Sequence, residues 1–125
     1  MNLSLKNIIV KVDRVSNSFK YKEQIKKIGL FGSVARGETT EHSDIDLVVD
    51  FEYLDFGNPV LNFDTWEIEG SNLINLEVKK YWDFENLLRF EFKPIELSVV
   101  ELDAVNQEGG IFKEELEKDV VWIYE

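Results

Sequence analysis

The 125-residue chain has no cysteine, two prolines, one histidine, and only 14 lysines and arginines against 25 aspartates and glutamates. Without cysteine it can form neither a disulfide framework nor a thiolate metal site. Its formal net charge of -11 disfavours binding to DNA or RNA, because such binding needs basic side chains that neutralise phosphates. The same charge favours a basic protein partner.

Long apolar runs are also missing from the sequence. No segment approaches the roughly 18 apolar residues of a membrane-spanning helix, so we expect no membrane association. The first residues lack the apolar core and small-residue cleavage site of a signal peptide, so we expect a cytoplasmic location. With 44% hydrophobic residues and no repeat or linker, the chain is predicted to form a single domain over residues 1–125.

The polar residues of greatest chemical interest lie in one stretch, residues 29–50, which reads GLFGSVARGETTEHSDIDLVVD. The apolar run that ends at Phe31 predicts a buried strand over residues 25–31. Gly32 allows a sharp turn and a close approach of a ligand, and Ser33 is expected to cap a short helix that ends near Arg36. The N-terminus of a helix suits a phosphate, and Arg36 is placed about one turn later, within reach of the same phosphates.

Asp44 and Asp46 stand at the start of a second strand, predicted over residues 44–51. Side chains alternate between faces along a strand, so both carboxylates point the same way, about 6–7 Å apart. Two carboxylates at this spacing can hold Mg²⁺ that bridges a nucleoside triphosphate. An ordinary acidic strand edge is the alternative, although aspartate is disfavoured in strands.

Other interpretations of the polar residues are weaker. Gly32 to Thr39 matches a P-loop pattern except that Glu38 stands where a lysine is required, and an anion there would repel phosphates. His42 is expected to be a solvated loop residue. We expect the tryptophans to lie in the core or on a partner surface rather than to stack on nucleic acid; they are Trp66, Trp82 and Trp122.

Gly32-Ser33, ten intervening residues and Asp44-Ile45-Asp46 resemble the signature of the DNA-polymerase-β-like nucleotidyltransferases. Arg36-Gly37 is most similar to its smallest members, the minimal nucleotidyltransferases. The resemblance implies an α/β (α+β) fold, a small mixed sheet flanked by helices. It also implies ATP as donor substrate, with Mg²⁺ held by the two aspartates and the phosphates held by Gly32, Ser33 and Arg36.

Family members carry a third carboxylate on a neighbouring strand, predicted here over residues 94–102. When the family pattern is aligned with this strand, Ser98 falls at the position of the third carboxylate. Glu96 lies on the same face of the strand, about 7 Å away. Either Glu96 completes the site as metal ligand and catalytic base, or the site binds nucleotide without efficient transfer. The second outcome follows because a hydroxyl is a weaker Mg²⁺ ligand and base than a carboxylate.

The resemblance implies transfer of a nucleoside monophosphate from ATP to an acceptor hydroxyl. Larger relatives hold the acceptor with a second domain, for which we expect no room here, so the acceptor site should come from a partner or a second copy. Similar minimal proteins act as antitoxins beside an all-helical HEPN ribonuclease, and some add AMP to its tyrosine. A degenerate protein that acts only by binding its partner is the alternative, and a modifier of small molecules is less favoured.

Apolar spacing predicts the remaining elements. We expect a first helix over residues 3–16, a helix over residues 83–90 that begins at Asp83, and a final helix over residues 111–124 after the loop at Gly109-Gly110. Residues 53–70 are compatible with an irregular hairpin or a frayed helix. Residues 73–78 are compatible with a strand or the start of a helix.

Overall fold

A computed structural model describes residues 4–38, 44–54, 60–62, 67–69 and 71–125, so His42 and Trp66 lie outside the described residues. Its centre is a mixed four-stranded sheet in the order β5-β2-β1-β6. β1 is antiparallel to both β2 and β6, whereas β2 is parallel to β5. This mixed α/β architecture is the predicted one. The strands are β1 (Ile25–Phe31), β2 (Ile45–Phe51), β5 (Leu97–Glu101) and β6 (Val121–Tyr124).

The two central strands follow the apolar runs of the sequence. β1 has the predicted bounds, and β2 begins one residue later than predicted, at Ile45. Gly29 allows β6 to lie close against β1, because a Cβ at this position would be 2.5 Å from Val120 Cγ2 and 2.9 Å from Trp122 Cε3. The sheet therefore depends on glycine in the middle of a buried strand.

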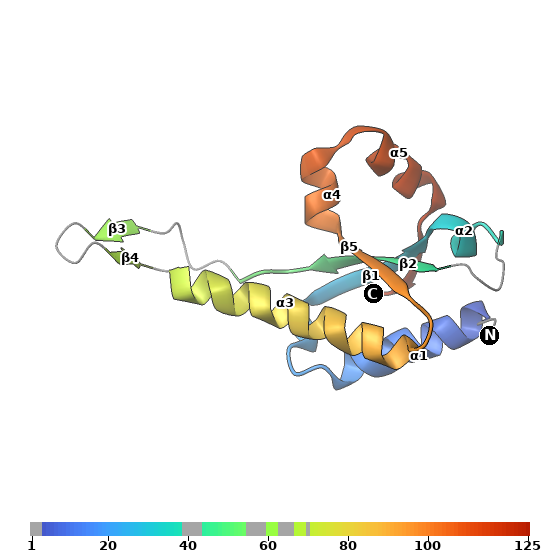
Figure 1. Cartoon of the computed structure of the whole chain (residues 1–125), viewed down its shortest axis with the longest axis horizontal. Helices are drawn as coiled ribbons and strands as arrows, with labels where there is room; N and C mark the ends of the chain where they lie inside the picture. Colours follow the sequence, from blue (N-terminus) through green and yellow to red (C-terminus); the bar gives the residue numbers. More distant parts are fainter. Residues whose placement is uncertain (1–3, 39–43, 55–59, 63–66, 70) are drawn as a thin grey trace.

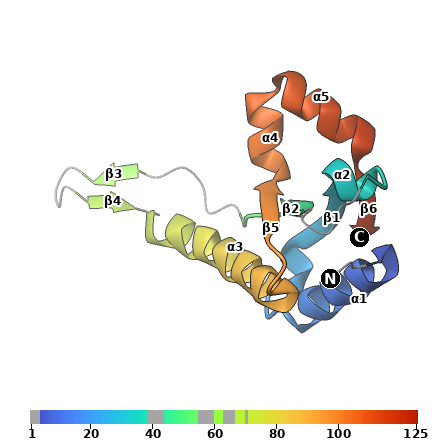
Figure 2. The same cartoon turned by 45° about the vertical axis from the view of Figure 1, so that its right-hand side comes forward.

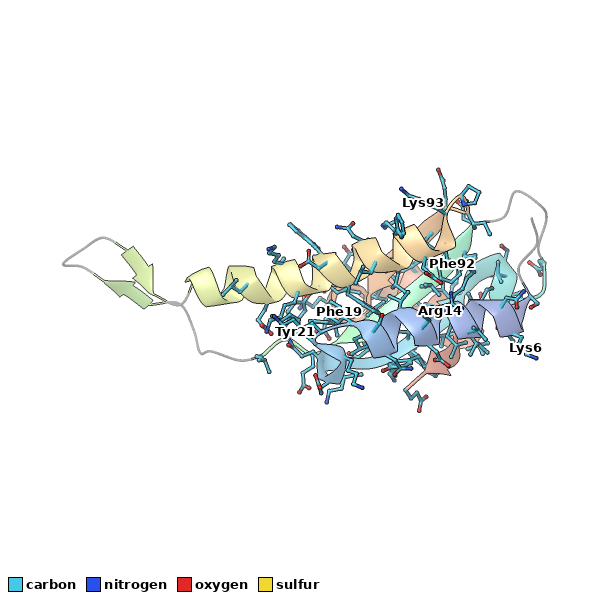
Figure 3. All side chains as sticks on the ribbon, turned by 90° about the horizontal axis from the view of Figure 1, so that it is seen from below. Lys6, Arg14, Phe19, Tyr21, Phe92 and Lys93 are labelled. Atoms are coloured by element: carbon cyan, nitrogen blue, oxygen red, sulfur yellow. The ribbon has the colours of Figure 1, made fainter. Side chains whose placement is uncertain are left out.

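Helices α1 (Leu5–Ser18) and α3 (Ser71–Phe92) cover one face of the sheet, side by side (Figure 3). Ser4 caps the N-terminus of α1, since its Oγ accepts a hydrogen bond from the Asn7 N–H at 3.2 Å. Arg14 Nη1 of α1 pairs with Glu91 Oε1 of α3 at 2.8 Å. The apolar layer beneath the two helices includes Ile8, Val12, Val15, Phe19, Tyr81, Phe84, Leu88 and Phe92.

The connection from β2 to β5 contains a small hairpin of β3 (Val60–Asn62) and β4 (Glu67–Glu69). This agrees with the hairpin alternative. The hairpin lies beyond the start of α3, away from the four-stranded sheet (Figure 1). The predicted helix start at Asp83 is wrong, because α3 already begins at Ser71 and Asp83 lies in its interior. Residues 73–78 belong to this helix, which ends at Phe92, before Pro94.

A buried ionic group fixes the exit of β2 against α3. Glu77 Oε1 accepts hydrogen bonds from Gln24 Nε2 at 2.7 Å and from the Leu54 N–H at 2.8 Å, and Lys80 forms a salt bridge with the same carboxylate. Gln24 ends the short 3₁₀ helix η1 (Lys22–Gln24) before β1. Although burial alone would raise the pKa of Glu77, these partners lower it below its usual value.

The other face of the sheet is covered by α4 (Leu102–Glu108) and α5 (Gly110–Asp119) (Figure 2). Its apolar cluster is small: Phe31, Val48, Val105 and Leu116. The short helix α2 (Gly32–Ala35) follows β1, and its Val34 and Ala35 pack against the apolar layer of the first face. The predicted helix over residues 111–124 is wrong in its second half, where the chain turns at Val120 and adds β6 to the edge of the sheet. Among the described residues no helix is both long and apolar enough to cross a membrane.

Candidate nucleotide site

The turn between β1 and β2 brings a glycine against a carboxylate. Gly32 has φ +74°, a conformation that favours glycine, and a Cβ at this position would overlap Asp46 Oδ2. Phe31 and Asp46 are register partners in the antiparallel pair, which explains why the residue after Phe31 contacts this carboxylate. The turn is therefore built around both glycine properties: its backbone freedom and its lack of a side chain.

The short helix starts one residue earlier than predicted. α2 begins at Gly32 and its N-cap is Phe31, so Ser33 lies inside the first turn; no side chain within the described part of the chain caps this helix. The positive φ of Gly32 supplies the sharp turn that a capping residue would otherwise make. Backbone N–H groups in the first turn of a helix have no intrahelical partner, and they remain available to an anion.

The two aspartates lie close enough to influence each other. Asp46 is half-buried and Asp44, the residue before β2, is exposed. Burial raises the pKa of Asp46, the neighbouring charge of Asp44 raises it further, and the charge of Arg36 opposes both. Two carboxylates that repel each other in a partly buried site are stabilised when a cation binds between them.

The parallel pairing of β2 with β5 decides which residue lies beside Asp46. In this register Asp46 pairs with Ser98, and the Ser98 side chain is exposed. Glu96 precedes the strand; its carbonyl accepts a hydrogen bond from the Ile45 N–H at 3.2 Å, and its side chain is exposed. Among the residues that the structure describes, no three His, Cys, Asp or Glu side chains converge as a group that could hold a metal ion.

Arg36 follows α2 and makes two ion pairs with carboxylates. Its Nε lies 3.0 Å from Glu38 Oε2, and its Nη1 lies 2.7 Å from Asp119 Oδ2 at the end of α5. Both hydrogen bonds raise the pKa of Arg36, and the hydrogen bond to Glu38 has the larger effect. Glu38 is only two residues from Arg36, so local spacing is a weak signal for this pair, whereas nothing in the sequence indicates Asp119, which α5 brings from 83 positions along the chain.

Comparison with known proteins identifies the family of the chain. A family model described as a nucleotidyltransferase domain matches residues 12–123. The chain belongs to this family of nucleotidyltransferase domains.

Individual relatives match over shorter segments. A provisionally named protein adenylyltransferase of Methanocaldococcus jannaschii is 59% identical over 39 residues, which cover 28% of this chain and 39% of the relative. The protein adenylyltransferase MntA of Thermococcus cleftensis is 57% identical over 28 residues, or 22% of this chain and 28% of that protein. The chain therefore spans less than half the length of each of these curated relatives.

One solved structure, described as the crystal structure of a toxin–antitoxin with AMP-PNP, is similar over 92% of this chain and 71% of its own. Its TM-score is 0.46 and its sequence identity 16%.

Proposed function

We propose that the protein is a Mg²⁺-dependent nucleotidyltransferase that moves AMP from ATP to a hydroxyl group on a partner protein. The observation that supports this most directly is the contact of Gly32 with Asp46. It joins an anion-binding turn to a pair of carboxylates, in a chain whose family match spans the same residues. Neither half of this arrangement alone would favour a nucleotide over another ligand.

The residues present fit Mg²⁺. Magnesium in nucleotide sites is bound through one or two carboxylates together with substrate phosphates, and Asp44 and Asp46 supply two carboxylates that repel each other without a cation. When bound there, the metal neutralises charge that develops on the phosphates during transfer.

The remaining roles fall to groups of the chain itself. The backbone N–H groups of α2, the Ser33 hydroxyl and the Arg36 guanidinium would bind the β- and γ-phosphates. The acceptor oxygen attacks the α-phosphorus, its proton passes to Glu96, and the bond to the bridging oxygen breaks to release pyrophosphate. Glu96 suits this role in one respect: its side chain is exposed, so an acceptor carried by a partner can reach it.

We propose a HEPN-type toxin as the protein partner, with this chain as its antitoxin and a cytoplasmic location for the pair. Two observations support a protein acceptor. The relatives above are named protein adenylyltransferases, and the net charge of -11 suits a basic partner better than a nucleic acid. A second copy of the chain is the other possible source of the acceptor.

A binding protein without efficient catalysis is the second candidate function, and the register of β5 favours it. Ser98 lies beside Asp46, where relatives carry a carboxylate, and a hydroxyl is a weaker ligand and base. Such a protein would inhibit its partner by contact alone, and its nucleotide site would be a remnant.

Label transfer tests the proposal. The protein is incubated with Mg²⁺, α-labelled ATP and a co-expressed HEPN-type protein, and an Asp44→Ala/Asp46→Ala variant is the control. We expect label on the partner that disappears with the double variant. A tight complex without label, unchanged in the variant, would contradict transfer and favour the binding protein.

Ser98→Asp separates the two candidates further. Because the Ser98 side chain is exposed, the substitution should not disturb the core, but it places a third carboxylate beside Asp46. If Ser98 occupies the position of a missing ligand, the variant gains transfer activity and is stabilised against heating by Mg²⁺ more than the unaltered protein is. If Glu96 already completes the site, neither property improves, and Glu96→Gln abolishes transfer.

A further inference from the structure

Arg36 is held from two sides by acidic residues that the proposed chemistry does not use. The group of Arg36, Glu38 and Asp119, which we call the Arg36 latch, has two short contacts, 3.0 Å to Glu38 and 2.7 Å to Asp119. The Asp119 side chain is 25% exposed, against 65% for Glu38. The pair with Asp119 is thus the better shielded of the two.

The position of Asp119 is set by packing. It is the last residue of α5, whose Leu116 is buried. The next residue, Val120, donates its N–H to the Leu116 carbonyl at 2.9 Å and packs over Gly29. The end of α5 and the start of β6 lie next to α2 (Figure 2). The carboxylate therefore reaches Arg36 from an anchored backbone.

A surface ion pair of this kind contributes little to stability. The α5 helix is already anchored by Leu116, in the cluster with Phe31, Val48 and Val105. The location of the pair is more informative than its strength. Arg36 donates its backbone N–H to the Gly32 carbonyl at 3.1 Å, and Gly32 lies against the Asp46 carboxylate, so the latch lies at the edge of the nucleotide site.

We infer that Glu38 and Asp119 compete with the phosphate oxygens of a nucleotide for the guanidinium of Arg36. The two carboxylates must leave the guanidinium before the phosphates can bind it. Arg36 with two carboxylates carries a net charge of -1, so the latch repels an incoming triphosphate until its carboxylates give way. Asp119 thereby lowers nucleotide affinity and restrains premature binding. This inference rests on the proposed function for the identity of the anion.

The test measures the dissociation constant of ATP with Mg²⁺ by calorimetry, in the full chain. Asp119→Asn should tighten binding about 3- to 10-fold, the range expected when one partly exposed ion pair no longer competes. Glu117→Gln is the matched control: it removes the same charge from the same helix, at a residue 61% exposed and paired with Lys113 at 3.8 Å. In an Arg36→Met background the gain from Asp119→Asn should disappear.

Each result has a distinct meaning. Tighter binding by Asp119→Asn than by Glu117→Gln, lost without Arg36, supports the latch. Equal binding by the two variants overturns the latch but leaves the nucleotide site intact, and weaker binding by Asp119→Asn shows that Asp119 orients Arg36, which also overturns it. If no variant binds ATP while all unfold at the temperature of the unaltered protein, both the latch and the proposed transferase are wrong.

Discussion

The two faces of the four-stranded sheet differ in what covers them. On one face α1 and α3 close over a continuous apolar layer, from Ile8 to Leu97. On the other, α4 and α5 cover a small cluster, and the strands there present polar residues such as Asp46 and Asp50. Burial raises the pKa of Asp50, nearby Asp103 raises it further, and Lys27 opposes the rise.

This contrast separates stability from function. The first face removes apolar surface from water and supplies most of the driving force for folding. The second face contains carboxylates that are less stable as charged groups in the fold than in water, an arrangement typical of functional sites. Substitutions on the two faces should therefore have opposite effects on stability and activity.

The largest effect on stability is expected at the centre of the apolar face. Phe84 is a fully buried residue on the inner side of α3, and Phe84→Ala should lower the free energy of unfolding by about 3–5 kcal/mol. Phe90→Ala, on the same helix at a residue 72% exposed, should change it by less than about 0.5 kcal/mol. Urea denaturation measures both, and a similar loss in the two variants would contradict the assignment of this layer as the core.

On the polar face, Asp46→Asn should reduce label transfer by about 100-fold, or about 3 kcal/mol, because a ligand of the metal is lost. The same variant should be more stable at neutral pH. The folded-state pKa of Asp46 is raised above its usual value of 3.8, so ionised Asp46 destabilises the fold once the pH exceeds that range. Asp46→Asn should melt at a higher temperature than the unaltered protein at pH 7, and this difference should vanish below about pH 4. A lower melting temperature of the variant at pH 7 would contradict the claim that ionised Asp46 destabilises the fold.

Gly32 and Gly37 provide a matched pair, because both have φ +74° but, among the residues that the structure describes, only Gly32 approaches another group. Alanine at either position should cost about 1–2 kcal/mol for the backbone conformation. Gly32→Ala should cost more than this and should also weaken ATP binding, because its Cβ would displace the Asp46 carboxylate. Equal losses of stability and of affinity in the two variants would refute the close approach.

A smaller effect is expected where the apolar face contains a charge. Glu77→Gln keeps the shape of the side chain but removes the anion that Lys80 and the Leu54 N–H contact, and should cost about 1–2 kcal/mol at pH 7. Since the folded-state pKa of Glu77 lies below its usual value of 4.5, its contribution is present above that pH and lost as the pH falls. The melting curves of Glu77→Gln and of the unaltered protein should converge in acid. A constant difference from pH 7 to pH 3 would disprove the contribution of the Glu77 charge.

Local patterns predicted the central strands well. The apolar run at residues 25–31 and the run after Asp44 are each a single strand length bounded by polar residues or glycine, which leaves little ambiguity. The second half of the final helix was predicted wrongly, because Val121–Tyr124 also continues a helical apolar pattern. Its β-branched and aromatic residues were the signal for a strand, but only pairing with β1 decides the matter.

Helix α3 was recognised only in part. Its solvent side carries Leu76, Leu87 and Phe90, all substantially exposed, so apolar residues occur around much of the helix and the periodic signal weakens. In the site, Ser98, the residue at which the family pattern expects a third carboxylate, is the register partner of Asp46. The contact of Asp119 with Arg36 depends on how α5 packs, which no spacing in the sequence reveals.

The parallel pairing of β2 with β5 also bears on the order in which the parts of the site form during folding. Gly32 and Asp46 meet within one antiparallel pair and are 14 positions apart, whereas Asp46 and Ser98 are 52 positions apart and meet only after α3 has returned the chain to the sheet. Contacts between distant parts of a chain carry a larger entropy of loop closure and form later. The position beside Asp46 is thus filled late in folding, and a chain that has formed only the β1–β2 pair presents its carboxylates without it.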